Sequence, residues 1–158
     1  MFAPAEFTPP FAPVPAAAAR TVLVVDDQAS VRISLEFLLG RRGYAVLLAE
    51  NAAAAVARMQ TQVVDAALVD LHMPETNGCE LCRRLAAQAA ASGRAIPLWL
   101  MTAAHTTEAA QRAIEAGAVG LLKKPFDCEE LCRAIDERLA TPVFVFPMQG
   151  TTPDGRSG

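Results

Sequence analysis

Polar side chains stand directly after several apolar runs of this sequence. Asp26 and Asp27 follow TVLVV, and Asp70 ends VVDAALVD. Thr102 ends IPLWLMT, and Lys124 follows VGLLK. If the apolar runs are parallel strands, their carboxyl ends meet at one edge of a sheet, where ligands bind in open α/β folds. The spacing therefore predicts a site of three carboxylates, a hydroxyl and an ammonium group.

Carboxylates gathered at one place need a cation among them. Two of them about 4 Å apart repel by roughly 4 kcal/mol at an effective dielectric constant near 20. Mg²⁺ prefers oxygen ligands, takes one or two carboxylates and leaves positions for phosphate oxygens. An aspartate can attack phosphorus and form an acyl phosphate, while a metal ion, a lysine and a hydroxyl stabilise the transferred group. The residues therefore indicate magnesium-assisted phosphoryl transfer.

The elements that must position these residues follow from the hydrophobic pattern. The strand runs are continuous Val/Leu/Ile stretches, typical of a parallel sheet that helices cover on both faces. Helical patterns alternate with them, which predicts five β/α units. We expect strands over 21–26, 44–49, 63–70, 96–102 and 119–122, and helices near 29–41, 52–60, 79–91, 106–116 and 128–140.

Capping residues support these helix boundaries. Ser30, Asn51 and Asp127 stand near predicted helix starts, where their side chains can accept hydrogen bonds from free backbone N–H groups. Gly43 and Gly117 stand just after predicted helix ends, where a left-handed backbone is common. The chain therefore reads as regular helices joined by short turns.

The pattern predicts one domain between two irregular segments. Residues 1–19 are rich in Pro and Ala without a helical or strand period, which predicts a flexible arm. Residues 20–140 hold the predicted domain. Residues 141–158 form a C-terminal tail that is too short for an output domain. Its VFVF run between Pro142 and Pro147 is either part of a linker or a segment that docks on its own domain or on a partner.

Composition excludes several function classes. The formal net charge is -3 and no basic stripe is visible, which argues against direct binding of nucleic acid. No apolar stretch is long enough and free enough of charge and proline to predict a membrane span. The N-terminus lacks the basic start and unbroken apolar run of a secretory signal, so we expect a cytoplasmic location.

Four motifs, over about residues 20–140, resemble the two-component response-regulator receiver family, including its single-domain chemotaxis and sporulation members. They are VLVVDD (22–27), DLHMPETNG (70–78), LMTA (100–103) and KKPF (123–126). Their order and spacing match the family as well. The resemblance implies a flavodoxin-like, doubly wound α/β fold with a five-stranded parallel sheet in the order 2-1-3-4-5 and helices on both faces.

The resemblance also implies roles for individual residues. Asp70 would be the phosphoacceptor. Asp26, Asp27, Asp70 and the backbone carbonyl of His72 would hold Mg²⁺. Thr102 would bind the phosphoryl group through its hydroxyl. The His72 side chain either touches the phosphoryl group or an attacking water, or is a loop side chain without a role.

Lys124 would pair with the phosphoryl group, and its bond to Pro125 would be cis, as is usual in the family. The implied function is a signalling switch in which a histidine kinase or histidine phosphotransfer protein donates phosphate and a downstream target protein binds the switched surface. Catalysis would be limited to the domain's own phosphorylation and dephosphorylation. A homodimer through the fourth helix, fifth strand and fifth helix is a further family property.

The sequence departs from the family pattern at Leu121. Receiver domains usually carry Tyr or Phe three residues before the conserved lysine that corresponds to Lys124. This aromatic side chain moves inward in the active state. A leucine gains about 1.5–3 kcal/mol from burial whatever the phosphorylation state. We therefore expect Leu121 to point inward in both states.

Other functions remain open at this stage. A magnesium-dependent hydrolase of the haloacid dehalogenase type also uses Asp and Lys, but its Asp-x-Asp motif follows the first strand. The chain could also be the receiver part of a larger regulator or hybrid kinase. Cys79-x-x-Cys82 suggests a redox motif, although buried Cys is the simpler interpretation. A zinc site with Cys128 and Cys132 is unfavourable, because the third and fifth helices should cover opposite faces of the sheet.

Overall fold

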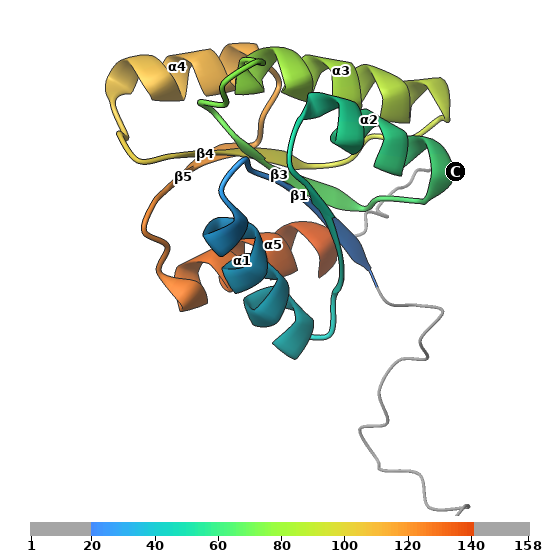
Figure 1. The fold of residues 1–158 in the computed structure, drawn as a ribbon, viewed down its shortest axis with the longest axis horizontal. Helices are drawn as coiled ribbons and strands as arrows, with labels where there is room; N and C mark the ends of the chain where they lie inside the picture. The colour runs from blue at the N-terminus through green and yellow to red at the C-terminus, as the bar shows by residue number, and fades with distance from the viewer. Residues whose placement is uncertain (1–19, 141–158) are drawn as a thin grey trace, which may run out of the picture.

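The computed structural model describes residues 20–140, which form a parallel sheet between two layers of helices (Figure 1). The strand order β2-β1-β3-β4-β5 confirms the predicted flavodoxin-like topology. The predicted arm at 1–19 and the tail at 141–158 lie outside the described residues. The strands are β1 Thr21–Val25, β2 Ala45–Ala49, β3 Ala66–Asp70, β4 Leu98–Thr102 and β5 Gly120–Lys123; the helices are α1 Ala29–Arg41, α2 Ala52–Thr61, α3 Gly78–Ala91, α4 Thr107–Glu115 and α5 Cys128–Ala140.

Both faces of the sheet are packed with apolar side chains, as the continuous Val/Leu/Ile runs predict. Helices α2, α3 and α4 cover one face, and α1 and α5 cover the other (Figure 1). Alternate residues of a strand point to opposite faces, so Leu23 packs under α3 whereas Val24 packs under α1 and α5. The three central strands are almost completely buried, which fixes their carboxyl ends relative to one another.

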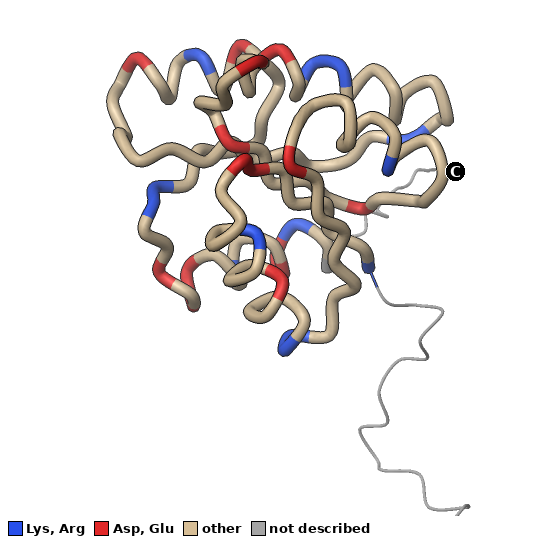
Figure 2. The backbone as a smooth tube through the Cα atoms, viewed as in Figure 1, with Lys and Arg blue, Asp and Glu red and all other residues tan. Residues whose placement is uncertain are grey.

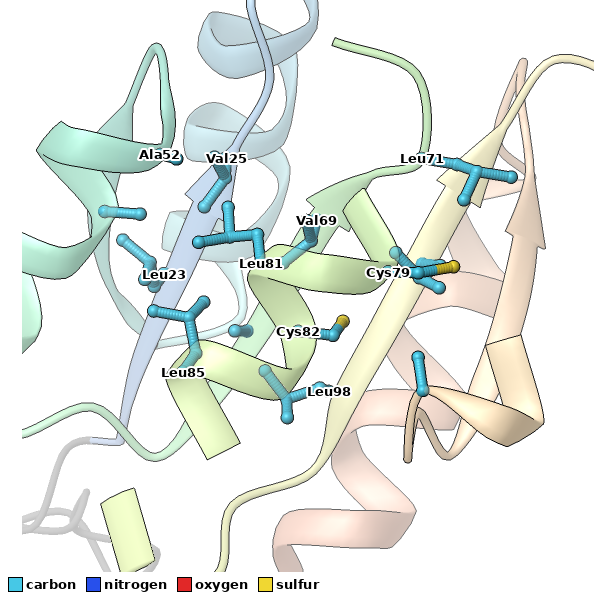
Figure 3. Close-up of a cluster of buried hydrophobic side chains, with 14 of the residues drawn as sticks. Leu23, Val25, Ala52, Val69, Leu71, Cys79, Leu81, Cys82, Leu85 and Leu98 are labelled. Atoms are coloured by element: carbon cyan, nitrogen blue, oxygen red, sulfur yellow. The ribbon is translucent and has the colours of Figure 1, made fainter. Parts of the chain in front are cut away.

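The cysteines serve as small apolar side chains in these cores. Cys79 and Cys82 lie in the core under α3, together with Leu81 and Leu85 (Figure 3). Burial raises the pKa of Cys82 to about 12, so its thiol is a poor nucleophile at neutral pH. Cys132 is buried in the core on the other face of the sheet. A single metal site shared by these cysteines is therefore ruled out by their positions.

Helix ends follow most of the predicted caps. The side chains of Asn51 and Asp127 accept hydrogen bonds from Ala54 N–H and Glu130 N–H. Gly43 and Gly117 have φ values of +95° and +90°, where a side chain would be strained. The expectation for Ser30 was wrong.

Helix α1 is capped at Gln28, without a side-chain hydrogen bond, and Ser30 lies inside its first turn. Asp26 explains this difference, because its carboxylate accepts the Gln28 N–H at 2.9 Å and so takes part of the capping role.

Two aspartates tie together segments that are distant in the sequence. Asp65 accepts hydrogen bonds from Thr21 N–H and from Arg94, both within 2.8 Å. Asp136 on α5 accepts hydrogen bonds from Tyr44 Oη and from Arg42 Nη2, which join α5 to the turn after α1. Within residues 20–140, none of the helices has the length and apolar character needed to cross a membrane.

Candidate functional site

The acidic residues after β1 and at the end of β3 come together at one edge of the sheet. Because these strands are neighbours, carboxylate oxygens of Asp26, Asp27 and Asp70 lie within 4.8 Å of one another. In Figure 2 the acidic positions gather where these strands end. Asp26 is 0% exposed and Asp70 is 5% exposed, whereas Asp27 faces solvent. Bulk water therefore cannot solvate two of the three carboxylates.

Lys124 follows the edge strand β5 and extends toward these carboxylates across the end of β4. Its ammonium Nζ lies 2.7 Å from Asp26 Oδ2 and 3.4 Å from Asp70 Oδ1. Its backbone N–H donates to the Thr102 carbonyl at 2.7 Å, and the bond to Pro125 is cis. The neighbouring Lys123 is exposed. The structure thus brings Lys124, and not Lys123, into the acidic cluster.

The environment of Asp70 disfavours its charged form. Burial is the largest cause, the charge of Asp26 adds to it, and together they raise the pKa of Asp70 to about 6. Lys124 and the His72 N–H, which donates to Asp70 Oδ1 at 3.3 Å, act in the opposite direction. An added cation would stabilise the ionised carboxylates and lower this pKa further.

Asp26 is held by several hydrogen bonds from its own part of the fold. Its backbone N–H donates to the Ala49 carbonyl at 3.1 Å. Arg32 Nη1 on α1 donates to the Asp26 carbonyl at 2.8 Å. Arg32 was missed by sequence reasoning, since a single arginine in the first turns of a helix carries no motif. It fixes the position of the backbone that carries both Asp26 and Asp27.

Thr102 and His72 both lie beside the acidic cluster, but they differ in burial and in their hydrogen bonds. Thr102 is fully buried, and its hydroxyl exchanges hydrogen bonds with the Ala104 backbone at 3.1 and 3.2 Å. The His72 side chain is exposed, and the His72 backbone forms an antiparallel bridge with Asn77. Leu121 is partly buried and packs against the core under α2, α3 and α4. The inward position expected for Leu121 is therefore the one it has here.

Gly78, the first residue of α3, permits the close approach of this helix to the acidic site. A Cβ atom at Gly78 would collide with the Asp70 carbonyl oxygen and lie 2.7 Å from Leu71 Cα. The Gly78 N–H donates to the Leu71 carbonyl at 3.0 Å. The backbone that carries Asp70 is thus packed directly on the helix start, where no side chain fits.

The site is open to solvent beside Asp27. A cavity of about 250 Å³ lies between the loops after β1, β2 and β3, with Asn51 and Met73 in its lining. The donor set here consists of carboxylate and backbone oxygens, which suits Mg²⁺ better than a softer metal. The residues therefore fit a hard divalent cation next to an accessible carboxylate.

Comparisons with known proteins agree with this geometry. The family model described as "Response regulator receiver domain" matches residues 22–136. The chain is 38% identical over 130 residues to the sensor histidine kinase AruS of Pseudomonas aeruginosa, which covers 82% of this chain and 13% of that protein. It is 34% identical over 137 residues to the response regulator MprA of Mycolicibacterium vanbaalenii, covering 87% of this chain and 54% of that protein.

Solved structures share the fold as well. The chemotaxis protein CheY4 of Vibrio cholerae superposes with a TM-score of 0.71 at 30% identity, covering 77% of this chain and 99% of that chain. The family match includes Asp26, which follows β1, and Asp70, which ends β3, and it decides against the hydrolase alternative. The chain belongs to the response regulator receiver domain family.

Proposed function

We propose that the chain is a phosphorylation-activated switch of two-component signalling in which Asp70 accepts the phosphoryl group. The observation that carries the proposal is the buried Asp70 carboxylate, which lies beside Asp26 and Asp27 with Lys124 Nζ 3.4 Å away. As a member of the receiver family, the chain is a phosphoacceptor rather than a conventional enzyme.

The chemistry needs an ionised Asp70. A carboxylate oxygen of Asp70 attacks phosphorus, the bond from phosphorus to the donor breaks, and the leaving group takes the electron pair. Asp26, Asp27, Asp70 and the His72 carbonyl would hold Mg²⁺, which supplies charge neutralisation. Lys124 then pairs with a phosphoryl oxygen in place of the Asp70 carboxylate. The Thr102 hydroxyl turns from the Ala104 backbone toward the phosphoryl group.

The proposal extends to partners. The family implies a histidine kinase as phosphate source, and a histidine phosphotransfer protein supplies the same donor chemistry. A downstream target protein would read the phosphorylated surface, and the face made by α4, β5 and α5 is a candidate dimer interface. Since the chain spans 54% of MprA and 13% of AruS, it can also act as the receiver part of a longer regulator. A cytoplasmic location is included in this proposal.

Phosphorylation by a small donor tests the proposal directly. We expect acetyl phosphate to add one phosphoryl group when Mg²⁺ is present and none in EDTA, because carboxylate repulsion opposes the incoming anion. Intact mass spectrometry measures the addition. Asp70→Asn should abolish it, whereas Asp65→Asn, which changes an aspartate outside the site, should not. Labelling that persists in Asp70→Asn would contradict the assignment of Asp70 as the phosphoacceptor.

Lys124 and Lys123 form a matched pair for testing the phosphoryl contact. We expect Lys124→Ala to weaken binding of beryllium fluoride, a phosphoryl mimic, by roughly ten- to a hundredfold, since a charged hydrogen bond contributes about 1.5–3 kcal/mol. Lys123→Ala should change it little, because that side chain is exposed. An NMR titration in Mg²⁺ measures both. Equal losses of affinity in the two variants would contradict the assignment of Lys124 as the lysine that contacts the phosphoryl group.

Leu121 is expected to change position little when Asp70 is phosphorylated. Its side chain already packs against the core, so an inward movement would add little further burial. Shifting a population from 1:99 to 99:1 takes roughly 5.5 kcal/mol, which must then come from Thr102 and residues 102–107. Methyl NMR with and without beryllium fluoride follows both regions. A transition of the Leu121 methyls from exposed to buried would show that leucine replaces the usual aromatic residue.

A further inference from the structure

Arg32 lies where a positive charge is unfavourable. It is the fourth residue of α1, and the start of a helix favours negative charge. Its side chain is only 17% exposed, whereas that of Arg112, an arginine in a surface ion pair, is 51% exposed. A guanidinium that has lost most of its water needs protein groups in exchange. The partners of Arg32 should therefore show what this residue does.

The guanidinium of Arg32 contacts the segments that follow β1 and β2. Its Nη1 donates to the carbonyl oxygen of Asp26 at 2.8 Å, and its Nη2 lies 4.0 Å from Glu50 Oε1. The Glu50 side chain is 68% exposed, so this long ion pair contributes little. The bond to the Asp26 carbonyl is therefore the main contact of the guanidinium.

This carbonyl belongs to the peptide unit that joins Asp26 to Asp27. A peptide unit is planar, so a fixed oxygen fixes the plane and the direction in which the chain enters Asp27. The Asp26 carboxylate does not need this support. Its Oδ1 accepts the Gln28 N–H at 2.9 Å, and its Oδ2 accepts from Lys124 Nζ at 2.7 Å. The contact with Arg32 therefore acts mainly on Asp27.

Asp27 has no such support of its own. Its side chain is exposed, and among residues 20–140 no donor forms a hydrogen bond with its carboxylate. This carboxylate nevertheless lies within 4.8 Å of those of Asp26 and Asp70, and Asp27 lines the open cavity beside them. A side chain that must be ordered when it binds a ligand reduces affinity, whereas an already ordered one does not. The fixed peptide plane supplies part of that order.

We propose that Arg32 is a positioning residue of the cation site, which holds the Asp27 carboxylate in the orientation that binds Mg²⁺ through the Asp26 carbonyl. The inference rests on the proposed function, because it assigns Arg32 a role toward the cation of that site. Charge alone predicts the opposite effect. A guanidinium repels Mg²⁺, so its removal would tighten binding if Arg32 acted only through its charge.

Calorimetric titration of the full chain with Mg²⁺ measures the effect. Arg32→Met leaves an unbranched side chain with neither charge nor donor. We expect its dissociation constant for Mg²⁺ to rise roughly tenfold, because groups that orient metal ligands typically contribute ten- to a hundredfold to affinity. Arg32→Lys keeps the charge on a single donor atom and should give an intermediate value. Urea denaturation beforehand establishes conditions in which each variant is fully folded.

Arg94→Met is the matched control. Arg94 Nη1 donates to the Val64 carbonyl at the same distance of 2.8 Å, and its Nη2 pairs with Asp65. These contacts precede β3, whereas Asp70 ends this strand, so they lie at the opposite end of the sheet from the cation site. We expect Arg94→Met to lower the stability of the fold but to keep the parent's affinity for Mg²⁺.

Backbone NMR in EDTA gives a second readout that does not depend on the cation. In the parent the amide of Asp27 should have an order parameter typical of rigid backbone, about 0.85. In Arg32→Met it should fall toward the flexible range, below about 0.6, and in Arg94→Met it should stay at the parent's value.

Two results would overturn the inference while leaving the proposed function in place. One is a parent that binds Mg²⁺ and an Arg32→Met variant that binds it as tightly or more tightly. The other is an equal loss of affinity in Arg32→Met and Arg94→Met, which would make the effect a general consequence of destabilisation. A parent that binds no Mg²⁺ would instead reject the cation site of the proposed function, and the inference with it.

Discussion

Asp70→Asn is expected to raise the free energy of unfolding of the protein in EDTA by about 1–3 kcal/mol near neutral pH. In the folded protein the pKa of Asp70 is raised from 3.8 to about 6, chiefly by burial and by Asp26. The folded state therefore holds a proton on Asp70 more tightly than the unfolded state does. Stability contributed by this group falls as pH rises from about 4 to about 6 and stays low above that range. Asparagine does not ionise, so Asp70→Asn avoids this loss of stability.

Urea denaturation in EDTA measures the effect at two pH values. At about pH 7.5 the variant should be more stable than the parent, whereas near pH 4 the difference should shrink because Asp70 is then largely protonated in the folded parent. Asp65→Asn is a useful contrast, because Asp65 pairs with Arg94 at 2.8 Å and its replacement should destabilise the protein. A variant that is less stable than the parent near neutral pH would contradict the electrostatic description of Asp70.

Mg²⁺ should offset most of the stability that Asp70→Asn gains over the parent in EDTA. The cation binds the folded acidic cluster and not the unfolded chain, so at about a hundred times its dissociation constant it adds roughly 2.7 kcal/mol. Asp70→Asn and Asp27→Ala should both lose most of this gain. Because Asp27 is exposed, its replacement leaves the core intact and isolates the effect on the cation. A full Mg²⁺ gain in Asp27→Ala would place the cation elsewhere.

Gly78→Ala is expected to destabilise the protein by about 2–3 kcal/mol and to slow phosphorylation of Asp70. The added methyl group would meet the Asp70 carbonyl oxygen and Leu71 Cα, both of them backbone atoms that a side-chain rotation cannot move away. Overpacking against a fixed neighbour typically costs about 1–3 kcal/mol. Urea denaturation and the rate of labelling by acetyl phosphate give the two effects.

Gly40→Ala is the matched control for this substitution. Gly40 lies inside α1, and a Cβ atom there would meet nothing within 4 Å. Alanine at such a helical position should stabilise the protein by about 0.5–1 kcal/mol. The two glycine substitutions should thus have opposite signs. If Gly78→Ala is as stable as Gly40→Ala, then α3 does not pack tightly on the backbone of Asp70.

The sequence by itself determined the elements and the edge of the sheet at which the site lies. Continuous apolar runs indicate strands buried on both faces, because burial pattern and backbone preference are local properties of a segment. Parallel strands then place their carboxyl ends together, so Asp26, Asp70 and Lys124 were expected at one edge before any distance was known. Short motifs identified the family in the same way.

Only the tertiary structure decided how those residues interact. The raised pKa of Asp70 depends on its burial and on its distance from Asp26, which lies 44 residues earlier in the chain. The Arg32 contact with the Asp26 backbone and the lack of space at Gly78 likewise depend on how a helix packs against a loop. Sequence patterns report local periodicity, whereas these contacts depend on the path of the whole backbone through the packed core.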